Sequence, residues 1–210
     1  MTATTATDAR TAIRDAVENW VVWRDSGDWE RFATVWHPEG QMTATWFQGS
    51  ATEFIEVSRA GMANGVHILH QLSGTSIDVA GERAIAQTKM SILQRAVVDG
   101  VEVDVTCVGR FYDFFQYAPS GTGPGWLIRR RQPIYEKDWL TVLDPGARLD
   151  IDAELLGRFP VGYRYLAYVQ SKSGFEVKSG LPGLTGTVVE NLYREGRDWL
   201  AGAPTPGNPV

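Results

Sequence analysis

Residues 67 to 90, HILHQLSGTSIDVAGERAIAQTKM, decide the fold, because hydrophobic and polar residues nearly alternate along them. A period of two is typical of a β-strand, in which successive side chains point to opposite faces. The AGER stretch at residues 80 to 83 interrupts the pattern with a turn. Strands that are joined this tightly run antiparallel. The stretch therefore predicts a β-hairpin with strands over residues 66–79 and 84–97.

The same period continues towards the C-terminus and predicts two further strands. Asp99 and Gly100 form a turn signal after the second strand. Residues 101–117 and 126–139 then predict strands, and the loop APSGTGPG at residues 118–125 lies between them. Together the four predicted strands make an antiparallel meander.

The residues before the hairpin predict helices. Residues 11–24 carry apolar side chains at helical spacing, which indicates an amphipathic helix. Residues 29–36 predict a second, short helix with Asp28 as its N-cap, and residues 50–62 predict a third. The stretch QMTATWFQG at residues 41–49 predicts a strand. Helices followed by a meander define an α+β fold.

The alternation is lost after the meander. Short helical patterns around residues 163–170 and 187–199 are separated by prolines and glycines. This part is too glycine-rich to form a second domain, so we expect a helical extension that packs on the domain or on a neighbouring subunit. The segments that we expect are a flexible N-terminus at residues 1–8, the α+β domain at 9–142, the C-terminal extension at 143–203 and a flexible tail at 204–210.

The composition excludes several classes of protein. The chain has 210 residues and a formal net charge of −5, whereas nucleic-acid binding needs a concentrated basic face. Its one basic run, Arg129 to Arg131, would split between the two faces of a strand. No stretch approaches the roughly 20 consecutive apolar residues that cross a bilayer. The first residues also lack the apolar region of a secretory signal. We therefore expect a cytoplasmic protein with no nucleic-acid or membrane partner.

Two of the three histidines, His67 and His70, lie on the first predicted strand. Residues three apart on a strand face opposite sides, so the two rings are poorly placed to bind one metal ion together. No Cys–Cys or His–Glu pair at ligand spacing accompanies them, and no glycine-rich phosphate loop precedes a helix. We therefore expect neither a metal ion nor a cofactor.

His70 shares its strand face with Ile68 and Leu72. An imidazole among aliphatic groups prefers to be neutral, because burial disfavours the charged form. Neutral imidazole is a base, and a carboxylate on its other nitrogen would fix the tautomer and stabilise the imidazolium that forms on proton uptake. A histidine in such surroundings is also often structural, so the pattern alone leaves both roles open.

Three stretches together resemble the SnoaL-like, nuclear-transport-factor-2-like superfamily. They are WVVWRDSGDWERFATVWHPEG at residues 20–40, the hairpin sequence quoted above, and GRFYDFFQY at residues 109–117 followed by WLIRRRQPIYEKD at residues 126–138. The resemblance covers roughly residues 8–140. It implies a cone-shaped domain in which a strongly bent antiparallel sheet wraps around N-terminal helices and leaves an apolar pocket open at one end.

The superfamily includes dehydratases, a dehydrochlorinase, ketosteroid isomerase, polyketide cyclases and non-catalytic binding modules, so the fold alone does not settle the function. Its Asp-plus-His enzymes carry an aspartate near the end of the first helix and a histidine on the first long strand of the meander. Asp25 in WRDSGDW and His70 in HQLSGTSI match these positions. The resemblance therefore implies that His70 is a base oriented by Asp25. An aspartate before Ser-Gly is also typical of a turn, which is the structural alternative.

Aromatic residues indicate what the pocket would bind. Eight tryptophans in 210 residues are more than a core of this size needs, and five of them lie in the first quarter of the chain. They favour a pocket for a flat or polycyclic apolar molecule. Trp23, Trp46 and Phe114 are the aromatic residues that we expect to contact such a substrate.

Three polar residues on the predicted meander are further candidates. Arg110 and Tyr112 share one face of a predicted strand, and Arg130 lies on the next strand. If these faces look into the cone, Tyr112 and Arg110 would act in catalysis by stabilising an oxyanion or assisting the leaving group, and Arg130 would bind the substrate. The alternative is that the arginines pair with carboxylates on the outside of the sheet.

These observations favour a cofactor-independent lyase acting on a hydrophobic, aromatic or cyclic small molecule. In it His70, oriented by Asp25, removes a proton and a β leaving group departs. One alternative is an isomerase or cyclase with the same dyad, and another is a non-catalytic module for small-ligand binding or dimerisation. We expect a homo-oligomer, a dimer or trimer, because the outer face of a bent sheet is apolar; the extension could supply that cover instead.

Overall fold

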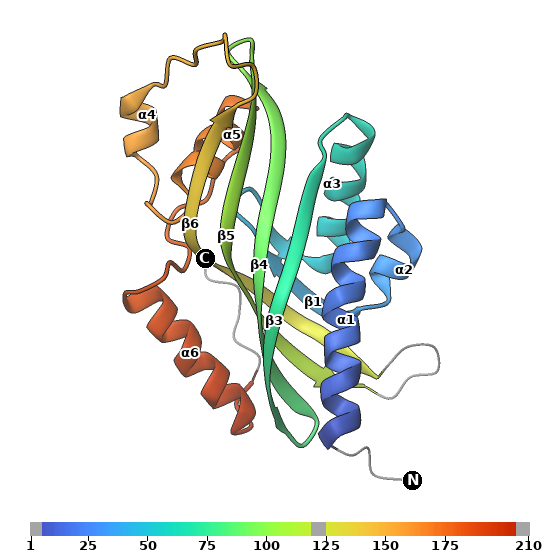
Figure 1. Ribbon diagram of the computed structural model, residues 1–210. Helices are drawn as coiled ribbons and strands as arrows, with labels where there is room; N and C mark the ends of the chain where they lie inside the picture. Colours follow the sequence, from blue (N-terminus) through green and yellow to red (C-terminus); the bar gives the residue numbers. More distant parts are fainter. Residues whose placement is uncertain (1–5, 119–124, 205–210) are drawn as a thin grey trace.

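The structure, a computed structural model, describes residues 6–118 and 125–204. The described part of the chain forms a long bent sheet with helices on both faces (Figure 1). Its elements in chain order are α1 (Ala6–Ser26), α2 (Trp29–Ala33), β1 (Trp36–Thr43), β2 (Gln48–Ser50), α3 (Ala51–Ala63), β3 (Ile68–Ala80), β4 (Arg83–Val98), β5 (Val101–Tyr117), β6 (Trp126–Val142), α4 (Ala153–Gly157), α5 (Arg164–Lys172) and α6 (Thr187–Leu200).

The predicted meander and the α+β fold class are confirmed. The strand order in the sheet is β2-β1-β6-β5-β4-β3, and β3 to β6 pair antiparallel in sequence order. The turn between β4 and β5 uses Asp99 and Gly100, both with positive φ (49° and 82°). A two-residue hairpin turn of this type needs positive φ at both positions, which explains the Asp-Gly pair.

The N-terminal helices form where the sequence predicts them. Asp28 caps α2, because its side chain accepts a hydrogen bond from the Arg31 N–H at 3.2 Å. Ser50 and Glu53 form a capping box at the start of α3, each side chain accepting from the other residue's backbone N–H. Such caps satisfy N–H groups that have no partner inside the helix.

Strand β1 differs from the prediction, which ended a helix at residue 36 and began the strand only at residue 41. It begins at Trp36, runs through Pro38 and Gly40, and pairs parallel with β6. The pairing register shifts between Trp36 and Gln41, so this part of the strand is irregular. A Cβ on Gly40 would lie 3.1 Å from the Ile128 carbonyl oxygen, and glycine therefore allows the close approach of the two strands.

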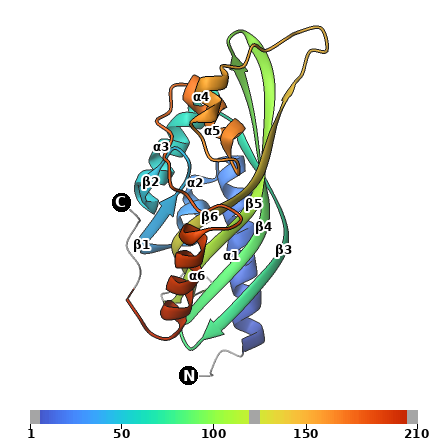
Figure 2. The same cartoon turned by 90° about the vertical axis from the view of Figure 1, so that its left-hand side faces the viewer.

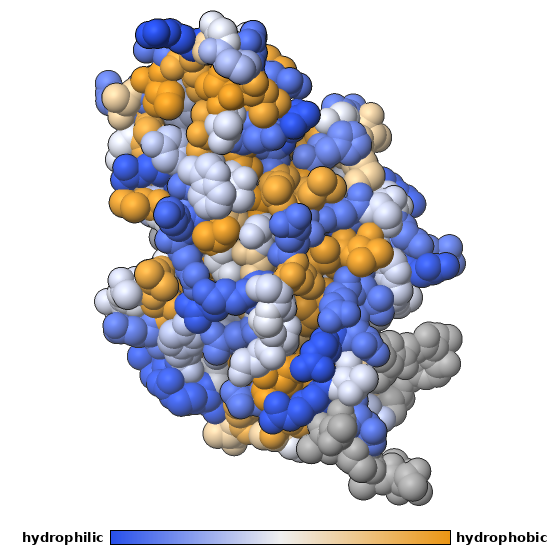
Figure 3. Space-filling view, in the orientation of Figure 1, coloured by the Kyte–Doolittle hydropathy of each residue, from blue (hydrophilic) through white to orange (hydrophobic). Residues whose placement is uncertain are grey.

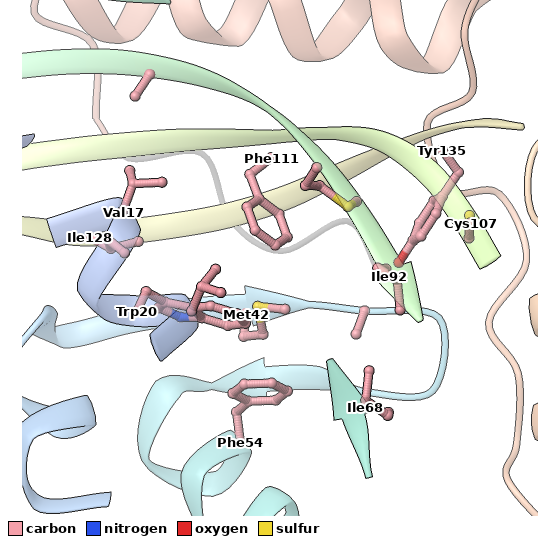
Figure 4. Packing of buried hydrophobic residues seen from close by; sticks show 14 of the residues in the cluster. Val17, Trp20, Met42, Phe54, Ile68, Ile92, Cys107, Phe111, Ile128 and Tyr135 are labelled. Atoms are coloured by element: carbon pink, nitrogen blue, oxygen red, sulfur yellow. The ribbon is translucent and has the colours of Figure 1, made fainter. Parts of the chain in front are cut away.

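The concave face of the sheet holds the main core. Its centre is an aromatic group from α1, α2, α3, β1 and β5. The ring centroid of Trp20 lies 5.3 Å from Phe32, 6.4 Å from Trp36, 6.2 Å from Phe54 and 5.4 Å from Phe111. Figure 4 shows part of this cluster, with Trp20 and Met42 between Phe111 and Phe54 in this view. Burial of such large rings dominates core stability.

The C-terminal extension packs on the α+β domain at two places. Helix α5 lies against β4, β5 and β6 at one end of the sheet, and α6 covers the face opposite α1. Figure 2 shows α6 in front of the strands and α1 behind them. Val189, Leu192 and Trp199 of α6 contact Tyr112 and Phe114 of β5. The outer face of the sheet is therefore buried where α6 lies, whereas Leu69, Val97 and Trp139 elsewhere on the strands stay exposed.

Helix α4 is a third helix in the extension, for which the sequence predicted two. The predicted flexible ends of the chain can be compared with the structure only in part. Residues 6–8 belong to α1, although a flexible N-terminus was expected there. Residues 1–5, most of the predicted loop (119–124) and residues 205–210 lie outside the described residues.

No helix of the described part is long and apolar enough to cross a membrane. Hydrophobic residues on the face in Figure 3 gather towards the end of the molecule near α4 and the β4–β5 turn.

Gly196 of α6 tests the docking of this helix on the sheet. A Cβ at this position would lie 1.9 Å from the Tyr112 hydroxyl oxygen. We expect Gly196→Ala to lower the free energy of unfolding by about 1–3 kcal/mol, because the helix must move away from β5. Urea denaturation measures the change. Gly157→Ala is the control, since nothing lies within 4 Å of the added Cβ. Equal stabilities of the two variants would contradict this packing of α6.

Candidate active site

Asp25 and His70 are in direct contact on the concave side of the sheet. Asp25 lies in the last turn of α1, and His70 is the third residue of β3. The His70 Nδ1 atom is 2.9 Å from Asp25 Oδ1, and the backbone N–H of His70 donates to Asp25 Oδ2 at 2.6 Å. Both carboxylate oxygens thus hold one residue. With Nδ1 donating to Asp25, Nε2 is the ring nitrogen that remains available as a base.

Arg24 supports the carboxylate from the other side. Its Nη1 atom donates to Asp25 Oδ1 at 3.1 Å and also to the backbone carbonyl of Ile68. The Arg24 and Asp25 side chains are only 5% and 12% exposed. Because β3 is held to α1 through both Arg24 and Asp25, the geometry of the dyad does not depend on a single contact.

The surroundings of His70 favour the neutral ring. Burial lowers its pKa below the usual 6.5, which outweighs the opposing hydrogen bond and charge of Asp25. The positive charges of Arg24 and Arg131 lower the pKa further. A neutral imidazole at neutral pH is able to accept a proton. The observed environment agrees with the prediction of an uncharged ring among apolar groups.

A small cavity of about 30 Å³ adjoins His70. Its walls are mainly apolar and aromatic, and Trp46, one of the predicted substrate contacts, is among them. Figure 4 shows several of these side chains around the space between α1, α3 and the strands. The main apolar lining residues are Trp20, Met42, Phe54, Ile68, Ile92 and Phe111.

The C-terminal extension closes one side of this cavity. Leu166 and Gln170 of α5 line it. The Gln170 side chain accepts a hydrogen bond from Thr45 Oγ1 at 2.6 Å and donates to Gln94 Oε1 at 3.3 Å. These three polar side chains are at most 3% exposed. Tyr135 also hydrogen-bonds Thr45, and burial raises the pKa of the tyrosine. Sequence reasoning missed this polar end of the cavity.

A buried ion pair lies behind the aromatic wall. Arg131 and Asp113 form two hydrogen bonds of 2.7 Å, and both side chains are 0% exposed. The Arg131 Cζ atom lies 3.9 Å from the ring centroid of Phe111 and 4.2 Å from that of Trp20. The pair therefore fixes two rings that line the cavity. The arginine run splits between the two faces of the sheet, but Arg131, and not the predicted Arg130, lies on the cavity side.

Four predicted site residues lie on the outer face of the sheet, opposite the cavity. Tyr112 packs below α6, where burial raises its pKa to about 12. Phe114 belongs to the same cluster. Arg130 pairs with Glu195 of α6 at 2.8 Å, and Arg110 pairs with Glu136 at 2.6 Å. The sheet separates these side chains from His70, so their expected contact with the substrate is corrected. The pairing of the arginines with carboxylates matches the alternative stated above.

The reason for this correction is the register of β5. Phe111 and Asp113 point inwards, so Tyr112 and Phe114 point outwards. Because α6 buries the outer face, the residues of both faces are hydrophobic and the sequence pattern does not distinguish them. The prediction that Trp23 contacts the substrate is also corrected. This residue is half-buried on α1 and is not one of the described residues that line the cavity.

Comparison with known proteins gives the same fold. The sequence matches the family described as SnoaL-like domain over residues 5–132. Among solved structures, a hexachlorocyclohexane dehydrochlorinase (LinA) type 2 superposes with a TM-score of 0.53 at 13% identity, over 71% of this chain and 99% of that one. A scytalone dehydratase-like protein of Novosphingobium aromaticivorans gives a TM-score of 0.50 at 18% identity, over 71% of this chain and 100% of that one.

Similar sequences extend across the C-terminal part as well. The uncharacterized protein AN9274 of Emericella nidulans is 37% identical over 205 residues, which is 92% of this chain and 86% of that protein. Pea pathogenicity protein 2 of Fusarium vanettenii is 35% identical over 204 residues, again 92% of this chain and 86% of that protein. The family match confirms the resemblance found in the sequence, and the chain belongs to the SnoaL-like family.

Proposed function

We propose that the protein is a cofactor-independent lyase that acts on a small hydrophobic, aromatic or cyclic molecule. The observation that carries the proposal is the 2.9 Å contact between Asp25 and His70 beside an apolar cavity. The SnoaL-like family and the dehydrochlorinase among similar structures support a small-molecule enzyme. Trp46 and the aromatic wall formed by Trp20 and Phe111 would hold the flat body of the substrate.

In the proposed reaction, His70 Nε2 removes a proton from a carbon next to an activating carbonyl group or ring. The electron pair left on that carbon forms a double bond to its neighbour, and the β leaving group departs with the electron pair of its own bond. Halide leaves as the anion, whereas a hydroxyl group takes up the proton that His70 has removed and leaves as water. Asp25 stabilises the imidazolium that results. General-base assistance of this kind supplies about 10²–10⁴-fold in rate. The steps use only the protein's own side chains, so we propose no cofactor and no metal ion.

An isomerase or cyclase would use the same proton acceptor, because the first step is identical. A non-catalytic binding module would be favoured if the cavity were plugged beside His70. The α5 residues that line the cavity are Leu166 and Gln170, and the described lining residues do not include the nearby Tyr163 or Tyr165. A homo-oligomer and a cytoplasmic location stay predictions. Helix α6 covers part of the outer face that prompted the expectation of an oligomer.

A substrate panel tests the proposed elimination. The purified protein is incubated with aromatic and cyclic β-hydroxy and β-halo carbonyl compounds, and new conjugated alkenes are detected by ultraviolet absorbance and mass spectrometry. We expect at least one compound to lose water or halide in a reaction that His67→Ala retains, since His67 is exposed. Absence of both elimination and deuterium exchange from solvent across the panel would contradict the proposal.

A further inference from the structure

A second cavity adjoins the first, between α3 and the extension. Its volume is about 30 Å³. Four side chains line both cavities: Arg24, Trp46, Ile68 and Gln170. Phe175, which follows α5, and Ser58 of α3 are among the residues that line the second cavity but not the first. Only these shared side chains would therefore separate a molecule in the second cavity from the first cavity, which adjoins His70.

Two polar atoms in the lining residues of this second cavity have no partner among the described residues. They are Ser58 Oγ and Arg24 Nε, and both atoms are buried. Ser58 and Arg24 are each 4% exposed. A buried donor without an acceptor costs free energy, so such exceptions in a folded protein call for an explanation. Both atoms are hydrogen-bond donors, and a bound acceptor would satisfy them.

The charge of the lining indicates what kind of acceptor fits. Arg24 is a cation, and the residues lining the second cavity include no aspartate or glutamate. The Nη1 atom of Arg24 already serves Asp25 and Ile68, which leaves the Nε edge for another partner. Trp46, Ile68 and Phe175 supply apolar surface next to it. A guanidinium edge in apolar surroundings strongly favours an anionic oxygen, because burial strengthens charge-assisted hydrogen bonds.

We propose that Arg24 Nε and Ser58 Oγ form a subsite for an oxyanion, a carboxylate or ionised phenol, carried on an aromatic body. The inference deepens the proposed function by naming the substrate class as a small aromatic acid. The acidic group sits between α3 and the extension, while the apolar part of the molecule extends past Trp46 and Ile68 towards His70. The loss of solvation of the acidic group is offset by two hydrogen bonds, one of them from a cation.

A binding assay without turnover tests this subsite. The probes are 2-naphthoate and its neutral isostere 2-naphthamide, titrated by calorimetry at pH 8, where His70 is neutral and naphthoate is ionised. We expect naphthoate to bind at least about tenfold more tightly than the amide, since a hydrogen bond to a charged group is worth more than one to a neutral group. Binding to the His70→Ala protein should show the same preference, which separates this test from that of the proposed base.

The decisive variant is Ser58→Ala. It should weaken naphthoate binding about tenfold and leave naphthamide binding unchanged, because a bond to a charged acceptor is lost. The melting temperature should not fall, since the Ser58 hydroxyl has no partner among the residues that the structure describes. Arg24→Lys, which keeps a cation beside Asp25 but removes Nε, should abolish the preference for naphthoate. The matched controls are Ser76→Ala and Arg59→Met, both at exposed positions.

Three results would overturn the subsite. One is the absence of naphthoate binding up to millimolar concentrations, and another is equal binding of naphthoate and naphthamide. The third is a Ser58→Ala protein that binds naphthoate as wild type does, or that loses both probes equally. If naphthoate binding responds as expected but the substrate panel shows no elimination, the subsite stands and the proposed lyase reaction fails.

Discussion

The His70→Ala protein is expected to lose about 10²- to 10⁴-fold in kcat/KM on any substrate that the panel identifies. The variant removes the proposed base, and Asp25 then faces an empty space where it held the imidazole at 2.9 Å. Steady-state kinetics measure the loss, and circular dichroism checks the fold. His67→Ala on the same segment is the control and should retain activity. Full activity in the His70→Ala protein would remove the base from the mechanism.

The pH profile gives a second readout of the same base. Burial lowers the pKa of His70 below 6.5, so kcat/KM should be constant at neutral pH and fall only as acid protonates the ring. Asp25 opposes that shift through its hydrogen bond and charge. In Asp25→Asn the acid limb should therefore move to lower pH while the plateau rate drops. A limb that stays in place, or that moves to higher pH, would contradict the proposed pairing.

Asp113→Ala is expected to lower the free energy of unfolding by about 3–5 kcal/mol. The change leaves the Arg131 guanidinium buried without its partner, and both side chains are 0% exposed. Such a loss is a large part of the roughly 5–15 kcal/mol that stabilises a typical domain. Urea denaturation at 25 °C measures it. The aromatic rings of Trp20 and Phe111, which lie against Arg131, should become mobile at the same time.

The chain offers a matched control for this prediction. Arg95 and Asp104 also form two hydrogen bonds, of 2.9 Å, between directly paired residues of neighbouring strands. Their side chains are 60% and 38% exposed, so Asp104→Ala should cost at most about 1 kcal/mol. Replacing both buried partners, as in Asp113→Leu with Arg131→Met, should recover most of the loss. Equal costs for Asp113→Ala and Asp104→Ala would show that burial does not control the energy of these pairs.

Local sequence was sufficient for most secondary structure. The turn at Asp99 and Gly100, the N-cap at Asp28 and the capping box at Ser50 each act within a few residues, so their signals are readable without tertiary information. Strand β1 was only partly predicted, because Pro38 and Gly40 are typical turn residues. Its parallel partner β6 lies about ninety residues further along the chain, and a local sequence pattern does not predict a pairing over that separation.

The sequence predicted the two residues at the centre of the candidate site, but it did not predict the side chains around them. Asp25 and His70 came from the resemblance, and the structure places them in contact. The sequence did not reveal which side of the sheet Tyr112 faces. The outer-face residues Tyr112 and Phe114 are apolar because they pack against α6, so they resemble the residues of the inner face. Gln170 bonds to Thr45 across 125 positions of sequence, so its place in the cavity wall depends on how the extension docks.

The sequence by itself determined where strands and helices begin and turn, because periodicity and caps depend on neighbours in the chain. It also determined that His70 and Leu72 share a strand face. Only the tertiary structure decided which face of β5 looks into the cavity, that Arg131 rather than Arg130 is inside, and that α5 closes the wall. Those outcomes depend on which apolar surfaces cover one another, and packing of that kind is settled by the whole chain at once.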